Sequence, residues 1–203
     1  MLAGSPPAWP PSTTGASGCI IELRLSKSGL LSEKRYSLFV EIRDYPGEWL
    51  LDLSLRNQSY LDWCRRSASL YDQTLRQSLM GDLHSELSQL NPLAPVDHQY
   101  LGSLHRHFQD FLKTCKKEGL SLIQPGRFLL PDVSTQKGML NFIPLTQCAN
   151  VSEDDLTNAG PDSYYMFCKS QYDEYVNTLV DPFYKQFFSK IDRQLVLVDV
   201  VRA

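Results

Sequence analysis

The stretch Val40-Glu-Ile-Arg-Asp44-Tyr-Pro-Gly47-Glu48 contains the change of pattern that decides the fold. Apolar residues stand at every second position of Tyr36–Arg43, which predicts a strand that leads directly into Asp44. Cys19–Leu25 has the same alternation, so we expect a second half-buried strand, joined to the first by a loop of about ten residues. Strands linked this closely usually pair side by side, and the sequence therefore predicts an antiparallel pair that ends at Asp44.

Asp44 and Gly47 form a DxxG motif at the carboxyl end of the second predicted strand. P-loop nucleotide hydrolases use this arrangement because the strand end fixes a carboxylate that can hold a Mg²⁺-bound water. The glycine lets a bare N–H approach a terminal phosphate, and the following residue, here Glu48, can position the attacking water. An ordinary strand-to-helix turn with Asp-x-Pro-Gly chemistry explains the same four residues, so the motif alone leaves both interpretations open.

The composition describes a globular chain and excludes several classes of protein. The 203 residues are 42% hydrophobic and carry a formal net charge of −3, which is unlike a disordered chain. The acidic balance is unlike the basic field of a nucleic-acid-binding protein. No apolar run is long enough for a membrane helix and no signal-peptide pattern opens the sequence, so we expect a cytoplasmic location. The five scattered cysteines form no CxxC pair, which predicts reduced and mostly buried thiols.

From about Asn57 the apolar residues recur at the helical spacing of about 3.6. The first predicted helix is long and places on one face Leu61, Cys64, Ala68, Tyr71, Leu75 and Leu79. A second helix is predicted from a cap at Asp97 to a left-handed terminator at Gly119. A third, rich in aromatic residues, is predicted for 162–191, with a kink or a division near Asp181 caused by Pro182.

Two further stretches lack a helical pattern. Ile123–Pro144 carries several Gly and Pro residues, and we expect irregular backbone there with a strand at 127–130. The chain closes on Gln194–Val201, an almost continuous β-branched run that is typical of a central strand covered on both faces.

The order of these elements is that of a small GTPase from its switch loop onward. Ser12-Thr13-Thr14 stands in a Pro-rich loop and is followed by two strands, the DxxG motif, helices and an apolar strand. Five stretches closely resemble the YcjX-like family of P-loop NTPases: Pro6–Pro10, DYPGEWLLDL at Asp44–Leu53, Pro92–Pro95, Ile123–Phe128 and Asp192–Asp199. These bacterial proteins are stress-associated and have a GTPase-like core.

The resemblance implies an α/β fold, in which a partial P-loop NTPase (G-domain-like) sheet carries a large, mostly helical insertion. Residues 1–56 would hold the switch loop, the strand pair and DxxG, 57–190 the insertion, and 191–203 a returning core strand. The implied activity is hydrolysis of GTP or ATP with Mg²⁺. The implied roles are Asp44 for the metal, Thr13 or Thr14 as the switch threonine, Gly47 for the γ-phosphate and Glu48 as the catalytic, water-positioning residue.

Two motifs of the family have no counterpart in these residues. The sequence contains no Gly-Lys-Ser/Thr and no TKxD or NKxD, so the phosphate cradle and the base-recognition motif are missing. We therefore expect the chain to correspond to the central portion of the family protein and to bind no nucleotide by itself. The alternative is a non-catalytic helical interaction module that takes a protein partner on the inserted helices and their aromatic residues.

Overall fold

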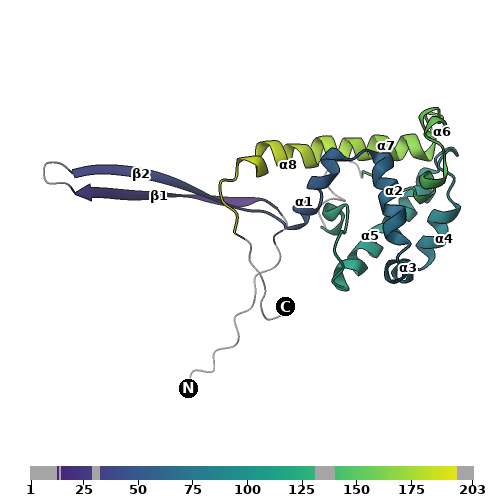
Figure 1. Cartoon of the computed structure of the whole chain (residues 1–203), viewed down its shortest axis with the longest axis horizontal. Helices are drawn as coiled ribbons and strands as arrows, with labels where there is room; N and C mark the ends of the chain where they lie inside the picture. The colour runs from purple at the N-terminus through teal and green to yellow at the C-terminus, as the bar shows by residue number, and fades with distance from the viewer. Residues whose placement is uncertain (1–12, 14, 29–32, 131–139, 196–203) are drawn as a thin grey trace, which may run out of the picture.

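A computed structural model describes residues 13, 15–28, 33–130 and 140–195. Its strands, β1 (Ser17–Ser28) and β2 (Glu33–Asp44), pair antiparallel in a register that joins Ser17 to Asp44 and Ser28 to Glu33. The predicted antiparallel pair is confirmed. Both strands are longer than expected at each end, so the loop of about ten residues predicted between them is wrong. Figure 1 shows this hairpin projecting away from a body built of helices.

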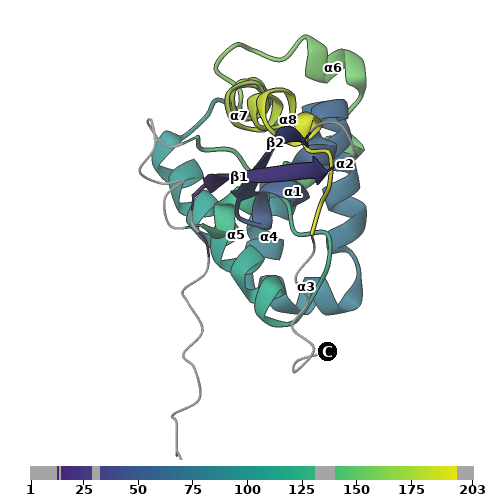
Figure 2. The same cartoon turned by 90° about the vertical axis from the view of Figure 1, so that its left-hand side faces the viewer.

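The hairpin is not half-buried, as its alternating pattern predicted. One face carries the cross-strand apolar pairs Cys19–Ile42, Ile21–Val40, Leu23–Leu38 and Leu25–Tyr36. Their large apolar side chains are nevertheless exposed, and Ile20 on the other face is 69% exposed. Figure 2 looks along the hairpin toward the helical body. In Figure 1 the hairpin is seen from the side, and most of its length lies clear of the described helices. The alternating sequence pattern correctly predicts an apolar face on the hairpin. No described element packs against that face, so its side chains remain exposed.

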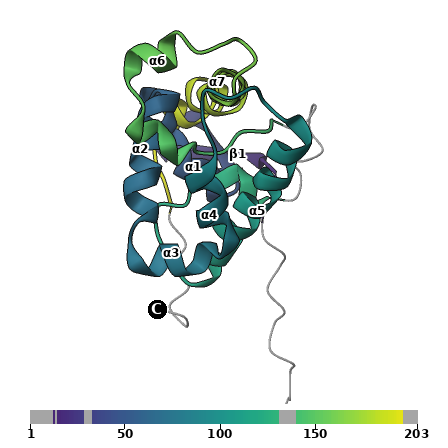
Figure 3. The ribbon, with the colours of Figure 1, turned by 90° about the vertical axis from the view of Figure 1, so that its right-hand side faces the viewer.

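Helices make up the body (Figure 3). The first part contains α1 (Glu48–Leu51), the 3-10 helix η1 (Leu53–Asn57), α2 (Tyr60–Tyr71), α3 (Thr74–Met80), α4 (Asp82–Gln89) and α5 (His98–Lys117). The second part contains η2 (Gly126–Leu129), η4 (Thr146–Asn150), α6 (Glu153–Thr157), α7 (Tyr164–Tyr175), the π-helix η5 (Val176–Val180), α8 (Asp181–Gln186) and η6 (Phe188–Lys190). No described helix is both long and apolar enough to cross a membrane.

The first predicted helix is in fact two helices. The chain leaves the helical conformation at Gln73, which is extended, and again at Gly81, whose φ of +55° separates α3 from α4. Leu75, predicted to face the core, is 54% exposed as a result. The two breaks let short helices fold back around α5, so the core is filled from several directions and the apolar spacing alone could not locate them.

The second predicted helix is confirmed as α5. The Asp97 side chain accepts hydrogen bonds from the amides of Gln99 (2.9 Å) and Tyr100 (3.0 Å), which caps the first turn. Gly119 has a φ of +71°, and its amide donates to the carbonyl of Lys116, so the helix ends where the sequence predicted.

The strand predicted at 127–130 is wrong. Gly126–Leu129 form the 3-10 helix η2, because the amides of Gly126 and Arg127 both donate to the buried Asp52 carboxylate and not to a neighbouring strand. Residues 131–139 lie outside the described part. The closing strand predicted at 194–201 also lies mostly outside it: Gln194 and Leu195 belong to no helix or strand of the described residues, and 196–203 are not described.

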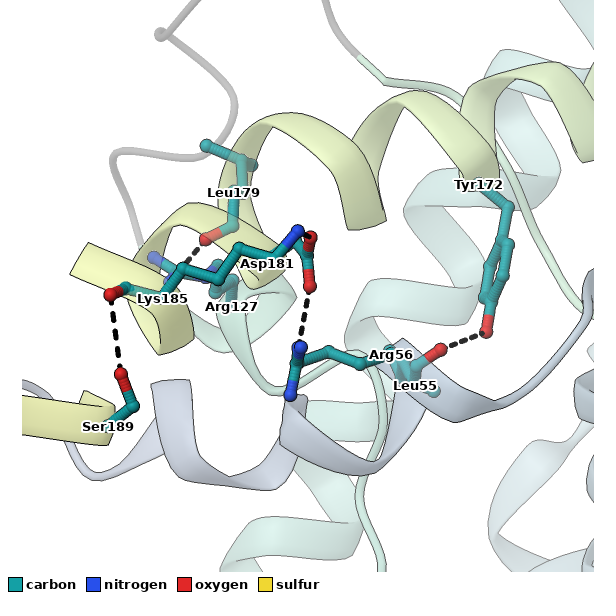
Figure 4. A network of polar contacts seen from close by, with 8 residues as sticks. All are labelled: Leu55, Arg56, Arg127, Tyr172, Leu179, Asp181, Lys185 and Ser189. Carbon is teal, nitrogen blue, oxygen red and sulfur yellow. Dashed lines mark hydrogen bonds and ion pairs between the residues drawn. The ribbon is translucent and has the colours of Figure 1, made fainter. Parts of the chain in front are cut away.

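The third predicted helix divides at Asp181, as Pro182 suggested. α7 passes through the π-helix η5 into α8, with Pro182 in the first turn of α8. In Figure 4, Arg56 of η1 reaches Asp181 at 2.6 Å, and the hydroxyl of Tyr172 donates to the carbonyl of Leu55. Lys185 and then Arg56 bond the Asp181 carboxylate and lower its pKa. These contacts hold the divided helix against η1.

The core is dominated by aromatic side chains from α2, α7 and the segment around Phe142. Trp63 stacks on Tyr172 with ring centroids 5.5 Å apart and meets Phe142 edge-on at 5.6 Å. The four cysteines other than Cys19 are free and buried among these groups, as the sequence predicted. Burial of several large rings supplies the main stabilisation of the body.

A buried carboxylate connects three distant parts of this core. Asp52, which directly follows α1, is fully buried and accepts hydrogen bonds from the Gly126 amide at 2.6 Å and the Tyr175 hydroxyl at 2.5 Å. The Arg127 amide donates to the same carboxylate at 3.2 Å, and its guanidinium lies 4.0 Å away. Asp52 therefore fixes α1 to η2 and α7 at once.

We predict that Tyr175→Phe lowers the free energy of unfolding by about 1–3 kcal/mol, because the buried Asp52 carboxylate loses one donor while the ring stays packed. Urea unfolding followed by circular dichroism measures the change. Tyr100→Phe is the matched control, since the Tyr100 hydroxyl makes no hydrogen bond within the described residues. Equal stability of the Tyr175 variant and the control would contradict the prediction.

A second prediction concerns pH. Burial raises the pKa of Asp52 from about 3.8 to about 6, while hydrogen bonds from Tyr175, Gly126 and Arg127 and the Arg127 charge oppose the rise. The folded state therefore binds this proton more tightly than the unfolded chain, so the stability contributed by Asp52 is present below about pH 4 and is lost as pH rises to about 6.

We expect the wild-type chain to lose about 3 kcal/mol of stability relative to Asp52→Asn between pH 4 and pH 7, since each pKa unit corresponds to about 1.4 kcal/mol. Urea unfolding of both chains across this range measures the difference and cancels the titration of the other carboxylates. A difference that is constant with pH would refute the assignment.

Candidate functional site

The structure brings two of the predicted site residues into contact. Asp44 is the last residue of β2, and its exposed carboxylate accepts a hydrogen bond from the Thr13 hydroxyl at 2.9 Å. The two residues are far apart in the sequence, and the antiparallel register brings them together by returning the chain to the base of the hairpin. Thr14, the other predicted switch threonine, lies outside the described residues. A carboxylate and a hydroxyl therefore meet where β2 ends.

Gly47 caps α1 in an ordinary helical conformation, with φ −59° and ψ −27°. A Cβ atom added at this position would meet nothing within 4 Å, so no described neighbour requires a glycine here. The described structure therefore requires a glycine at this position neither by conformation nor by close packing, although glycine is among the residues favoured at a helix N-cap.

Glu48 is the first residue of α1, and its carboxylate is held by a residue that the sequence analysis did not single out. The Lys116 ammonium, in the last turn of α5, lies 2.5 Å from Oε1 of Glu48. The Glu48 side chain is 17% exposed and that of Lys116 is 55% exposed. The helical body thus reaches the residue that follows DxxG. In the sequence, Lys116 was visible only as a cation suited to a helix end.

Aromatic and cationic groups fasten the same segment to the end of α8. Tyr45 meets Phe183 at 5.4 Å and Phe187 at 5.3 Å between ring centroids. The rings of Trp49 and Phe183 have centroids 5.2 Å apart. The Arg127 guanidinium lies over the Trp49 ring, 4.1 Å from its centroid. The residues on either side of Gly47 are therefore packed against the helical body. The sequence patterns placed Phe183 and Phe187 in the aromatic third helix and gave no indication that Tyr45 and Trp49 pack against them.

The donors present fit Mg²⁺ only in part. No cluster of three or more His, Cys, Asp or Glu side chains that could hold a metal occurs among the described residues. Asp44 and Thr13 supply one carboxylate and one hydroxyl, and Mg²⁺ in nucleotide sites uses few protein ligands because phosphates and waters complete its shell. A cavity of about 140 Å³ lies between α2, α4 and η4, and none of the predicted site residues lines it.

Comparison of the sequence with known proteins places the chain in a family. The chain is 38% identical over 206 residues to "Ras-like GTPase YcjX" of Escherichia coli (strain K12), which covers 100% of the chain and 44% of that protein. It is 36% identical over 210 residues to the protein of the same name from Shewanella oneidensis, covering 100% of the chain and 42% of that protein.

The chain thus spans less than half the length of these two relatives. The model of the YcjX-like family, DUF463, matches residues 1–203, which is the whole of the sequence. The resemblance to the YcjX-like family is confirmed, and this chain belongs to that family.

Proposed function

We propose that the full-length protein in which this chain occurs hydrolyses GTP with Mg²⁺, and that β2 and α1 contribute the metal-binding and water-positioning part of its site. The observation that carries the proposal is the contact between Thr13 and Asp44 at the end of β2. The names of the two relatives, both called Ras-like GTPases, favour GTP over ATP.

The proposed roles follow from the chemistry of each group. The Asp44 carboxylate would hold a water of the Mg²⁺ shell, and the hydroxyl of Thr13, or that of Thr14, would close on the metal. The Gly47 amide would contact the γ-phosphate, and Glu48 would orient the water that attacks it in line. Mg²⁺ would supply neutralisation of the phosphate charge, so that the protein's own residues act by positioning.

We also propose that the chain is divided between two structural units. Residues 1–56 and 191–203 would belong to a GTPase-like sheet and 57–190 to a helical insertion. Two observations support this division: the hairpin exposes an apolar face, and the buried apolar core, which runs from Leu55 to Val180, lies within 57–190 except for Leu55. A larger sheet, completed by sequence outside these residues, would cover the hairpin, because exposed apolar strands are otherwise prone to pair with other chains.

The alternative of a helical interaction module has weaker support. It relied on the aromatic residues of the third predicted helix as a partner surface, and four of these, Tyr164, Tyr165, Tyr172 and Tyr175, are buried in the core. We therefore retain hydrolysis as the proposed function, with the helical body as the part that holds the DxxG segment in place.

We predict that Asp44→Asn in the full-length protein lowers kcat for GTP hydrolysis with Mg²⁺ by at least about a hundredfold, because the metal loses its oriented water. Phosphate release measures the rate. Asp110→Asn, an equal change of charge on the exposed face of α5, is the control and keeps the wild-type rate. Unchanged hydrolysis in the Asp44 variant would refute the proposed function.

We predict that residues 1–203 alone bind GTP and Mg²⁺ more weakly than about 1 mM, because they contain no Gly-Lys-Ser/Thr cradle for the phosphates. Isothermal titration calorimetry with the isolated chain measures the affinity, and a melting curve before the titration establishes that it is folded. Micromolar binding would show that the described groups suffice.

A further inference from the structure

Glu48 is contacted by two residues of the helical body, one at its backbone and one at its side chain. The first contact is with the backbone: a Cβ atom placed on Gly126 of η2 would clash with the carbonyl oxygen of Glu48. η2 and α1 are therefore in direct backbone contact. Gly126 is itself held by its hydrogen bond to the fully buried Asp52, so the Glu48 backbone packs against a segment that this carboxylate fixes.

The second contact is with the side chain. Lys116 crosses from the end of α5 to Oε1 of Glu48 at 2.5 Å, over a separation of 68 residues in the sequence. The cation stands in the last turn of a 20-residue helix, where the helix dipole favours positive charge. Glu48 is largely covered and Lys116 is half exposed, so the carboxylate is the fixed partner and the lysine reaches over it.

An ion pair between Lys116 and Glu48 would reduce the repulsion between the Glu48 carboxylate and a bound phosphate. A free carboxylate next to the γ-phosphate is repelled by it, and this repulsion turns the side chain away from the attacking water. A lysine bonded to one carboxylate oxygen reduces the repulsion and restricts the side chain to one orientation, while the second oxygen is left for the water.

We propose that Lys116 is a positioning residue, which holds the Glu48 carboxylate in the orientation needed for GTP hydrolysis. The helical body then contributes directly to the rate and is not only a support for the sheet. This inference rests on the proposed function, because it assigns to Lys116 an action through Glu48 in that reaction.

Three variants of the full-length protein test the proposal by steady-state hydrolysis of GTP with Mg²⁺. Lys116→Gln should lower kcat about tenfold and leave KM within about twofold, since orientation of the water is lost and nucleotide binding is not. Lys116→Arg keeps the charge and should restore most of the rate. Lys117→Gln removes the same charge from the neighbouring position, which makes no ion pair within the described residues, and should match the wild type.

A double variant separates positioning from a merely structural role. If Lys116 acts through Glu48, Lys116→Gln should cause no further loss of kcat in a Glu48→Gln background. A further loss there would overturn the proposal, as would a wild-type kcat for Lys116→Gln alone. A loss of kcat that Lys116→Arg fails to restore also overturns it.

The proposed function and the role of Lys116 can be refuted separately. A reduced kcat in Glu48→Gln together with a wild-type kcat in Lys116→Gln overturns this inference and leaves the proposed function standing. Wild-type hydrolysis in Asp44→Asn overturns the proposed function, and this inference with it. Melting temperatures of all variants, measured alongside, should agree within a few degrees because a half-exposed ion pair contributes little to stability.

Discussion

The hydrogen bonds that converge on the Asp52 carboxylate are the constraint on which the rest of the structure depends. A buried carboxylate is costly unless donors surround it, and here the donors come from positions 126, 127 and 175, far apart in the sequence. In the folded structure, η2 and α7 therefore both lie at the end of α1. The aromatic packing around Trp63 and Phe142 adds apolar burial. The hydrophobic effect is not directional, whereas hydrogen bonds require a specific geometry, so the bonds to Asp52 specify the arrangement more narrowly.

This constraint explains why the DxxG segment is held by helices. Asp52 fixes the end of α1, Tyr45 and Trp49 pack on Phe183 and Phe187, and the start of α1 meets Gly126 and Lys116. The candidate metal-binding group Asp44 lies immediately before this packed segment, at the base of an exposed hairpin. The site therefore stands at the boundary between a well-packed body and a strand pair whose apolar face is exposed.

Local rules recovered much of the secondary structure. Period-two alternation located the strand pair, the Asp97 cap and Gly119 delimited α5, and Pro182 marked the division at Asp181. They failed where a tertiary contact replaced the local preference. Gly126–Leu129 is apolar enough for a strand, yet its amides bond Asp52, and the predicted first helix breaks so that α3 and α4 can wrap α5. The family was also recognisable, because DYPGEWLLDL is long and specific.

The sequence by itself determined the hairpin, the capped helix α5, the family and the residue types of the candidate site, because each depends on near neighbours in the chain or on a contiguous motif. Only the tertiary structure decided which of these residues meet. It joined Thr13 to Asp44, surrounded Asp52 with its donors and set Lys116 on Glu48. Contacts across 31 to 123 residues depend on how helices pack, and single-sequence patterns carry no signal for such pairings.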